Sequence, residues 1–456
     1  MVESILEKEQ PPMNAITYEM LESFSKEFHA QEKNEVAMRA VMKSGLSAAA
    51  ENMQEQIDNP MTFSIEIETG KITNQKSSGR CWLFAALNCM RFQIMKNLNL
   101  ETFELSQNYQ MFWDKMEKAN YFLESILDTV DEPTDGRLIS WLLMAPLNDG
   151  GQWDMLANII RKYGIVPKEA MPETFSSSCT REITPWMTKK LREFACTLRT
   201  AYAKGASMEE LQEKKQEMMS VIYRMLVIAL GKPPKTFTWE TRDKDKQFIR
   251  IADITPQQFF AEYVGWNLDD YVSIINAPTQ DKPFHHSYTV QYLGNVTEGH
   301  IVRHLNLPIE EMKKLAITQM QDGQVVWFGC DVGQFHEKDL GIMDTDGIQA
   351  GLLFDTDFPM TKAQRLDYGE SLMTHAMVFT GVNLDKVGKP NRWKVENSWG
   401  EDRGNKGFYI MSDRWFDEYM YQIVVNKKYL SKEQLKAYEE EPTVLAPWDP
   451  MGSLAL

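Results

Sequence analysis

Asn74-Gln-Lys-Ser-Ser-Gly-Arg-Cys81-Trp-Leu-Phe84 joins a polar, glycine-containing loop to an apolar run that continues to Phe92. The run predicts a helix that is buried on most sides and begins near Cys81. Unpaired backbone N–H groups and the positive end of the helix dipole favour a thiolate at such a position. We therefore predict that Cys81 is a nucleophile.

A cysteine nucleophile needs a base that becomes its cationic partner, and sequence context singles out His375. His375 begins an apolar, strand-like run, which places its ring at a sheet edge. Asn397 ends the next predicted strand, where its carboxamide oxygen would hold the imidazole N–H. Gln75 would point its amide at the carbonyl under attack and form an oxyanion hole with the backbone N–H of Cys81. The order Gln, Cys, His, Asn makes a chance combination improbable.

The remaining cysteines and histidines have no matching partners, and we interpret them as structural. They are Cys89, Cys179, Cys196, Cys330, His29, His285, His286, His300, His304 and His336. No Cys/His/carboxylate cluster has ligand spacing, so we expect no metal and no organic cofactor.

The order of periodic patterns along the chain predicts an α+β protein. Apolar residues recur at three-to-four spacing over 15–57, and further helices are expected over 105–118, 137–145 and up to Tyr163. Lys-, Glu- and Met-rich helical patterning dominates 180–235. Strands are expected at Phe63 to Glu68, and later over 288–293, 324–329, 376–382, 393–397 and 407–411. Helices early and an antiparallel sheet late predict a cleft where the two layers meet.

Composition excludes several classes of protein. The chain has 456 residues, 43% of them hydrophobic, which supports a substantial core. Its 49 basic and 65 acidic residues give a formal charge of −16, which argues against nucleic-acid binding. No apolar stretch is long enough to span a bilayer, and the N-terminal sequence lacks the features of a secretory signal. Five cysteines with no CxxC pair fit a reducing compartment, so we expect a cytoplasmic protein without membrane partners.

Three blocks of sequence resemble the papain-like cysteine peptidases. Gln75 six residues before Cys81-Trp82, His375-Ala, and Asn397-Ser-Trp-Gly match their three catalytic motifs. Val326-Trp-Phe-Gly-Cys-Asp-Val-Gly and the tail Pro447-Trp-Asp-Pro-Met-Gly-Ser-Leu-Ala-Leu are similar to the family of bleomycin hydrolase and bacterial aminopeptidase C. Cys81 and His375 are 294 residues apart, against about 130 to 150 in most papain-like enzymes, so about 150 residues are inserted.

The resemblance implies a papain-like two-lobed cysteine peptidase core with an inserted helical domain and a C-terminal arm. In this chain the corresponding parts are an N-terminal arm over 1–60, a helical lobe with the nucleophile over 61–180, the inserted domain over 181–280, a β-rich lobe with His375 and Asn397 over 281–440, and a tail over 441–456 that enters the cleft. The family assembles as a homohexameric ring with its active sites facing an inner chamber.

The resemblance also implies substrate-binding residues. Gly150 and Gly151 match the wall that binds the substrate backbone, and Trp399 belongs to the asparagine block. The family's tail blocks one side of the cleft, and its terminal carboxylate pairs with a peptide's free amine, which places Ala455 and Leu456 in the site. Family tails commonly stop at the position of Ala455. Either Leu456 is removed after synthesis, or the tail takes another course.

These observations lead to one main hypothesis and two alternatives. The main hypothesis is a cysteine aminopeptidase that trims short peptides through a thioester acyl-enzyme. The first alternative is an endopeptidase or oligopeptidase of the same family with its tail displaced. The second is a ring-shaped binding scaffold with a degenerate site, which the joint presence of Gln75, Cys81, His375 and Asn397 argues against.

Overall fold

The computed structural model describes residues 14–454, apart from the side chain of Gln56, and divides into two compact units. The smaller unit joins residues up to Met53 to Ile348–Pro359. Its helices are α1 (Tyr18–His29), α2 (Glu32–Ser44), α3 (Leu46–Ala50) and α14 (Ala350–Phe354). The two segments are held together by a hydrogen bond from Gln349 N to Ala50 O (2.8 Å) and by the ion pair between Lys33 and Asp355 (2.7 Å).

The larger unit contains the remaining helices and the main sheet. Its helices are α4 (Gln54–Asp58), α5 (Cys81–Asn97), α6 (Gln107–Asp128), α7 (Arg137–Met144), α8 (Trp153–Tyr163), α9 (Phe175–Ser178), α10 (Thr184–Ala203), α11 (Met208–Leu230), α12 (Pro256–Tyr263), α13 (Ile309–Gln321), α15 (Lys362–Asp367), α16 (Asp413–Tyr419) and α17 (Lys432–Glu439). The helices predicted over 15–57, 105–118, 137–145 and up to Tyr163 are confirmed.

A mixed sheet of twelve strands, counted within residues 14–454, forms one layer of this unit. Its order is β14-β5-β6-β4-β13-β7-β10-β11-β12-β9-β8, with β1 paired to β10. The strands are β1 (Ile65–Glu66), β4 (Tyr271–Ile275), β5 (His286–Val290), β6 (His304–Asn306), β7 (Val326–Cys330), β8 (His336–Glu337), β9 (Ile342–Met343), β10 (His375–Leu384), β11 (Pro390–Glu396), β12 (Phe408–Ser412), β13 (Met420–Asn426) and β14 (Thr443–Leu445). Every strand predicted from the sequence is present.

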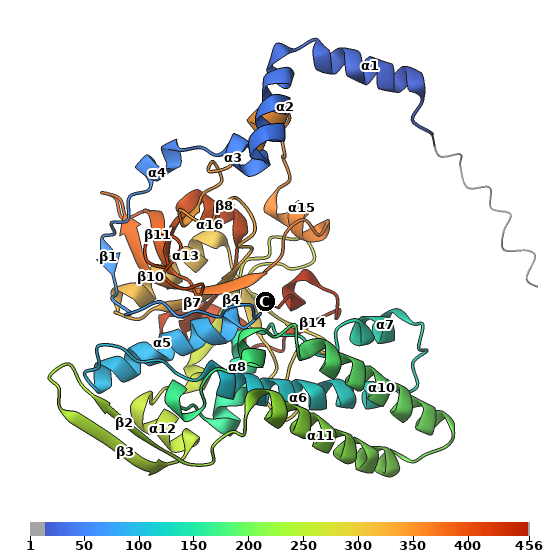
Figure 1. The fold of residues 1–456 in the computed structure, drawn as a ribbon, viewed down its shortest axis with the longest axis vertical. Coiled ribbons are helices and arrows are strands. Elements are labelled where there is room, and N and C mark those ends of the chain that lie inside the picture. Colours follow the sequence, from blue (N-terminus) through green and yellow to red (C-terminus); the bar gives the residue numbers. More distant parts are fainter. Residues whose placement is uncertain (1–13, 455–456) are drawn as a thin grey trace, which may run out of the picture. The chain divides into compact units, whose positions relative to one another are not determined.

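Helix α5 lies between the main sheet and the helices α6 and α8 (Figure 1). It contacts β7 and β10 on one side and α6 and α8 on the other. This position explains its composition, because a helix covered on both sides must be apolar around most of its circumference. Cys81 at its first turn is therefore held where the helical layer meets the sheet, which confirms the predicted α+β arrangement.

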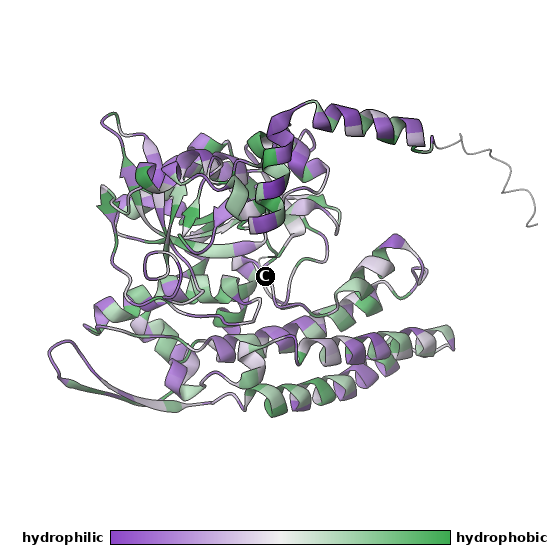
Figure 2. Ribbon diagram, turned by 45° about the horizontal axis from the view of Figure 1, so that its top comes forward, coloured by the Kyte–Doolittle hydropathy of each residue, from purple (hydrophilic) through white to green (hydrophobic). Residues whose placement is uncertain are grey.

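The range 181–280, predicted to be an inserted helical domain, holds α10, α11 and α12, and also contains strands. A capping box between Ser207 and Glu210 begins α11, and Figure 2 shows hydrophobic and hydrophilic residues along both long helices. The hairpin of β2 (Phe237–Arg242) and β3 (Phe248–Ile254) follows, and β4 pairs with β13 in the main sheet. The assignment of this range to a separate domain remains a prediction.

Within the described part of the chain, none of the helices has the length and apolar composition that crossing a bilayer requires.

Candidate active site

Cys81 is the first residue of α5 and is fully buried. The backbone N–H of Ala376 donates to its Sγ at 3.4 Å, so the sulfur lies against the start of β10. Burial raises the pKa of the Cys81 thiol to about 12, although this N–H and those of Trp82 and Cys81 itself act in the opposite direction. The thiolate therefore needs a cation beside it to exist at neutral pH.

His375 and Asn397 come together because of the strand register. β10 begins at His375 and its antiparallel neighbour β11 ends at Glu396, one residue before Asn397. His375 Nε2 lies 2.9 Å from Asn397 Oδ1, and both residues are buried. An oxygen acceptor at Nε2 requires the proton on that nitrogen, which leaves Nδ1 as the ring's acceptor.

Trp399 covers this pair. Its ring centroid lies 4.9 Å from that of His375, and its other neighbours are His336 at 5.7 Å and Tyr409 at 6.0 Å. An indole over the imidazole keeps water from the hydrogen bond to Asn397, which is stronger in the resulting low dielectric. The structure thus places Trp399 against the histidine, and the substrate-binding role expected for it remains a prediction.

Gln75 is oriented by the loop that follows β11. Its backbone N–H donates to Ser398 O at 2.8 Å, and Ser398 Oγ donates to its Oε1 at 2.6 Å. Its Nε2 donates to Ser78 O at 2.6 Å. A carboxamide carries two N–H groups, so the other stays available to a ligand. The hydroxyl of Ser398 thus settles which way the amide of Gln75 faces.

Gly150 and Gly151 are brought beside the residue that follows Cys81. A Cβ atom on Gly151 would lie 2.5 Å from the Trp82 ring, so only glycine fits there. Trp82 Nε1 donates to Asp149 O at 2.7 Å, and Lys118 Nζ donates to Gly150 O at 2.5 Å. These contacts fix the backbone of the glycine pair relative to the start of α5.

Two buried ion pairs anchor the loop that precedes Cys81. Arg80 donates to both carboxylate oxygens of Glu173, at 3.0 and 2.8 Å. Asp149 accepts from the backbone N–H of Gly79 at 3.2 Å and from Lys115 at 2.5 Å. Burial alone would raise the pKa of Asp149, but Lys115 holds it well below its usual range. Arg80 likewise lowers the pKa of Glu173 against the effect of burial, so both carboxylates are ionised at neutral pH and hold the loop in place.

The C-terminal tail reaches the same region. β14 pairs with β5, and the side chain of Met451 is buried. Ser453 bridges the space between Gln152, next to the glycine pair, and Met373, two residues before His375, and we call this space the groove. Ser453 Oγ donates to Met373 O at 2.6 Å, and Gln152 Nε2 donates to Ser453 O at 2.6 Å. Ala455 and Leu456, which the sequence places in the site, lie outside the described residues.

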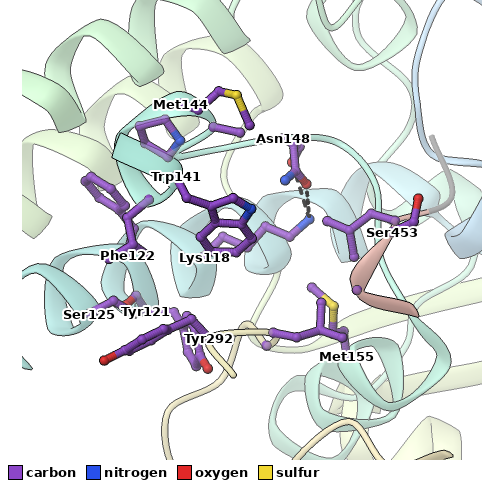
Figure 3. A pocket seen from close by; sticks show the side chains of 17 residues that line it. Lys118, Tyr121, Phe122, Ser125, Trp141, Met144, Asn148, Met155, Tyr292 and Ser453 are labelled. Carbon is purple, nitrogen blue, oxygen red and sulfur yellow. Dashed lines mark hydrogen bonds between the residues drawn. The ribbon is translucent and has the colours of Figure 1, made fainter. Parts of the chain in front are cut away.

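A cavity of about 350 Å³ adjoins the tail (Figure 3). Tyr121 and Phe122 of α6 and Trp141, Leu142 and Met144 of α7 form one part of its wall. Lys118 and Asn148 border it on the side of Ser453. Gly452, Ser453 and Leu454 close one side. The tail is therefore both a neighbour of the glycine wall and part of the lining of this cavity.

Three carboxylates gather elsewhere in the described part of the larger unit, in Glu55, Asp344 and Asp346. Arg414 pairs with all of them, at 2.7 Å to Glu55, at 2.6 Å to Asp344, and by a third ion pair to Asp346. The guanidinium supplies the positive charge that such a cluster needs, and we interpret the group as an ion-pair network.

Sequence reasoning missed three residues of this region: Gln152, Ser398 and Ala376. Ser398 and Ala376 lie within quoted motifs, and Gln152 directly follows Gly151. Adjacency to a motif is therefore a usable signal. Ala376 contributes through its backbone N–H, which side-chain identity does not reveal.

The sequence matches the peptidase C1-like family over residues 15–452. It is 51% identical to aminopeptidase C of Listeria monocytogenes over 441 residues, covering 97% of this chain and 99% of that protein. It is 47% identical to human bleomycin hydrolase over 391 residues, covering 84% of this chain and 86% of that protein. The crystal structure of PepW from Lactobacillus rhamnosis superimposes with a TM-score of 0.95 at 54% identity, covering 97% of this chain and 99% of that one.

Proposed function

The chain belongs to the peptidase C1-like family and is a papain-like cysteine aminopeptidase, and from this premise we propose how its residues perform the reaction. Cys81 is the nucleophile, His375 is the base and acid, and Asn397 orients the imidazole. Gln75 and the backbone N–H of Cys81 form the oxyanion hole. One contact carries this assignment: the backbone N–H of Ala376 donates to the Cys81 sulfur. Ala376 directly follows His375, which is hydrogen-bonded to Asn397.

The reaction proceeds by acyl transfer. His375 takes the proton of the thiol, and the Cys81 sulfur attacks the peptide carbonyl to form the S–C bond of a tetrahedral intermediate. The C–N bond then breaks as the imidazolium gives its proton to the leaving amine, which leaves a thioester. Water, deprotonated by His375, attacks the thioester, and the thiol and the free carboxylic acid are released. The amide of Gln75 stabilises the oxyanion in both halves.

The tail restricts this chemistry to the first residue of a peptide. Gly452 to Leu454 lie along the cavity beside the glycine wall, so an extended peptide cannot continue through that side. The terminal carboxylate, supplied by Leu456 or by Ala455 after its removal, receives the peptide's ammonium group. Gly150 and Gly151 bind the substrate backbone.

A comparison of free and blocked peptides tests this specificity. We expect a peptide with a free α-amine to be cleaved at its first bond and its N-acetylated form to be cleaved at least ~100-fold more slowly, because acetylation removes a charge-assisted contact. Product masses and initial rates supply the measurement. Equal cleavage of both peptides, or cleavage inside the blocked one, would favour the endopeptidase alternative. Intact mass establishes whether Leu456 is retained.

We further propose that the enzyme is a homohexamer that acts on peptides in the cytoplasm, with no nucleic-acid or membrane partner. The family's ring assembly supports the hexamer. The five cysteines, all of which are free thiols, support a reducing compartment such as the cytoplasm. Light scattering coupled to size-exclusion chromatography is expected to give six times the chain mass of 52.8 kDa. A monomer at micromolar concentration would contradict the assembly while leaving the peptidase assignment intact.

A further inference from the structure

The tail is held at its base by a buried lysine. Lys282 Nζ, in a side chain only 4% exposed, lies 2.9 Å from Asp449 Oδ2 and 2.7 Å from Asp281 Oδ2. Asp449 also accepts the N–H of Met451 at 2.8 Å and thereby begins the short turn Pro450–Gly452. One carboxylate thus fixes both the attachment of the tail and the direction in which it leaves β14.

A second contact holds the tail at its tip, four residues further on. Gln152 directly follows the glycine wall, and Met373 lies two residues before His375. Ser453 bonds to both, through its carbonyl to Gln152 and through its hydroxyl to the carbonyl of Met373, each at 2.6 Å. The tip therefore bridges the two sides of the groove.

The tail has additional packing on either side of Asp449. The Met451 side chain is buried, and the Arg137 guanidinium lies 3.7 Å from the centroid of the Trp448 ring. Past this point Gly452 to Leu454 close one side of the cavity of about 350 Å³ (Figure 3). Loss of either hold would therefore uncover this cavity.

We propose that Lys282 and Gln152 are specificity-determining positioning residues, which keep the tail in the groove and so maintain exopeptidase action. This inference rests on the proposed function, because it assigns a cause to the preference for a free amine. Neither residue touches the reacting atoms. Lys282 acts through Asp449, and Gln152 acts through Ser453.

Lys282→Met and Gln152→Ala test the proposal through the ratio of blocked-peptide to free-peptide kcat/KM. Because a buried ion pair loses one partner, we expect Lys282→Met to raise this ratio about 30-fold. Gln152→Ala removes one hydrogen bond and should raise it about 5-fold. The blocked substrate carries leucines before the scissile bond, to suit the apolar walls of the cavity. Asp449→Asn should also raise the ratio, because it removes the partner of Lys282.

Lys313→Met provides a matched control. Lys313 is also 4% exposed, and its nearest carboxylates are Asp413 at 2.7 Å and Asp417 at 2.6 Å, away from the tail. The Lys313→Met variant should lose about as much thermal stability as Lys282→Met, while its ratio of blocked-peptide to free-peptide kcat/KM stays that of the wild type. An unchanged ratio in Lys282→Met and Gln152→Ala, or an equal rise in Lys313→Met, overturns the inference. If the proposed function itself fails, the wild type shows no preference for the free amine.

Discussion

Cys81→Ala is expected to lower kcat/KM for an aminoacyl fluorogenic amide by about 10⁴- to 10⁶-fold, the range over which loss of a covalent nucleophile acts. In the proposed mechanism the sulfur forms the acyl-enzyme, and it is fully buried beside the N–H of Ala376. The chain should still fold and assemble, because alanine removes one atom from the start of a helix. Initial rates and the chromatographic profile measure the two effects.

Cys196→Ser is the matched control for this substitution. Cys196 is an exposed thiol on α10, so its replacement should leave the rate within about twofold of the wild type. Substantial hydrolysis by Cys81→Ala would remove the basis of the mechanism. Loss of activity in both variants would point to a general effect of thiol replacement.

The proposed catalytic group could be selected from the sequence because each of its members has a strong local context. Cys81 follows a glycine-containing loop into a helix, His375 begins an apolar strand, and Asn397 follows the next strand. The pairing of the strands then brings His375 and Asn397 together, because an antiparallel hairpin of β10 and β11 places the first residue of one strand near the end of the other. Gln75 was predictable from its distance to Cys81.

Two central strands, β4 and β13, were not predicted. All five residues of Tyr271–Ile275 are buried, as are the first six of Met420–Asn426. A strand covered on both faces has no alternation of polar and apolar residues, so periodicity does not identify it.

The contacts that fix the tail could not be predicted from the sequence, for a different reason. Lys282 and Asp449 are 167 positions apart, and Gln152 and Ser453 are 301 apart. Neither pair has a spacing that a helix, strand or turn would impose. Such contacts follow only from the packed structure, in which β5 and β14 lie side by side. The specificity of the enzyme is therefore less visible in the sequence than its chemistry.

His375→Ala is expected to lower kcat/KM about 10⁴-fold and to change how the thiol reacts with pH. Burial raises the pKa of Cys81 to about 12, so without a cationic partner only about one thiol in 100,000 is ionised at pH 7. The wild type, with His375 as the proton acceptor, should be alkylated rapidly by iodoacetamide at about pH 6. The variant should react slowly there and progressively faster as pH rises, because the thiolate fraction grows towards that pKa.

The alkylation profile separates the roles of sulfur and imidazole, because it needs no substrate and no tail. His286→Ala replaces an exposed histidine at the start of β5 and should keep the profile of the wild type. Peptide mapping after labelling identifies Cys81 as the reacting thiol among the five. If His375→Ala reacts as fast as the wild type at about pH 6, the thiolate is stabilised by the N–H groups of Ala376, Trp82 and Cys81 alone, and the imidazole serves only in proton transfer.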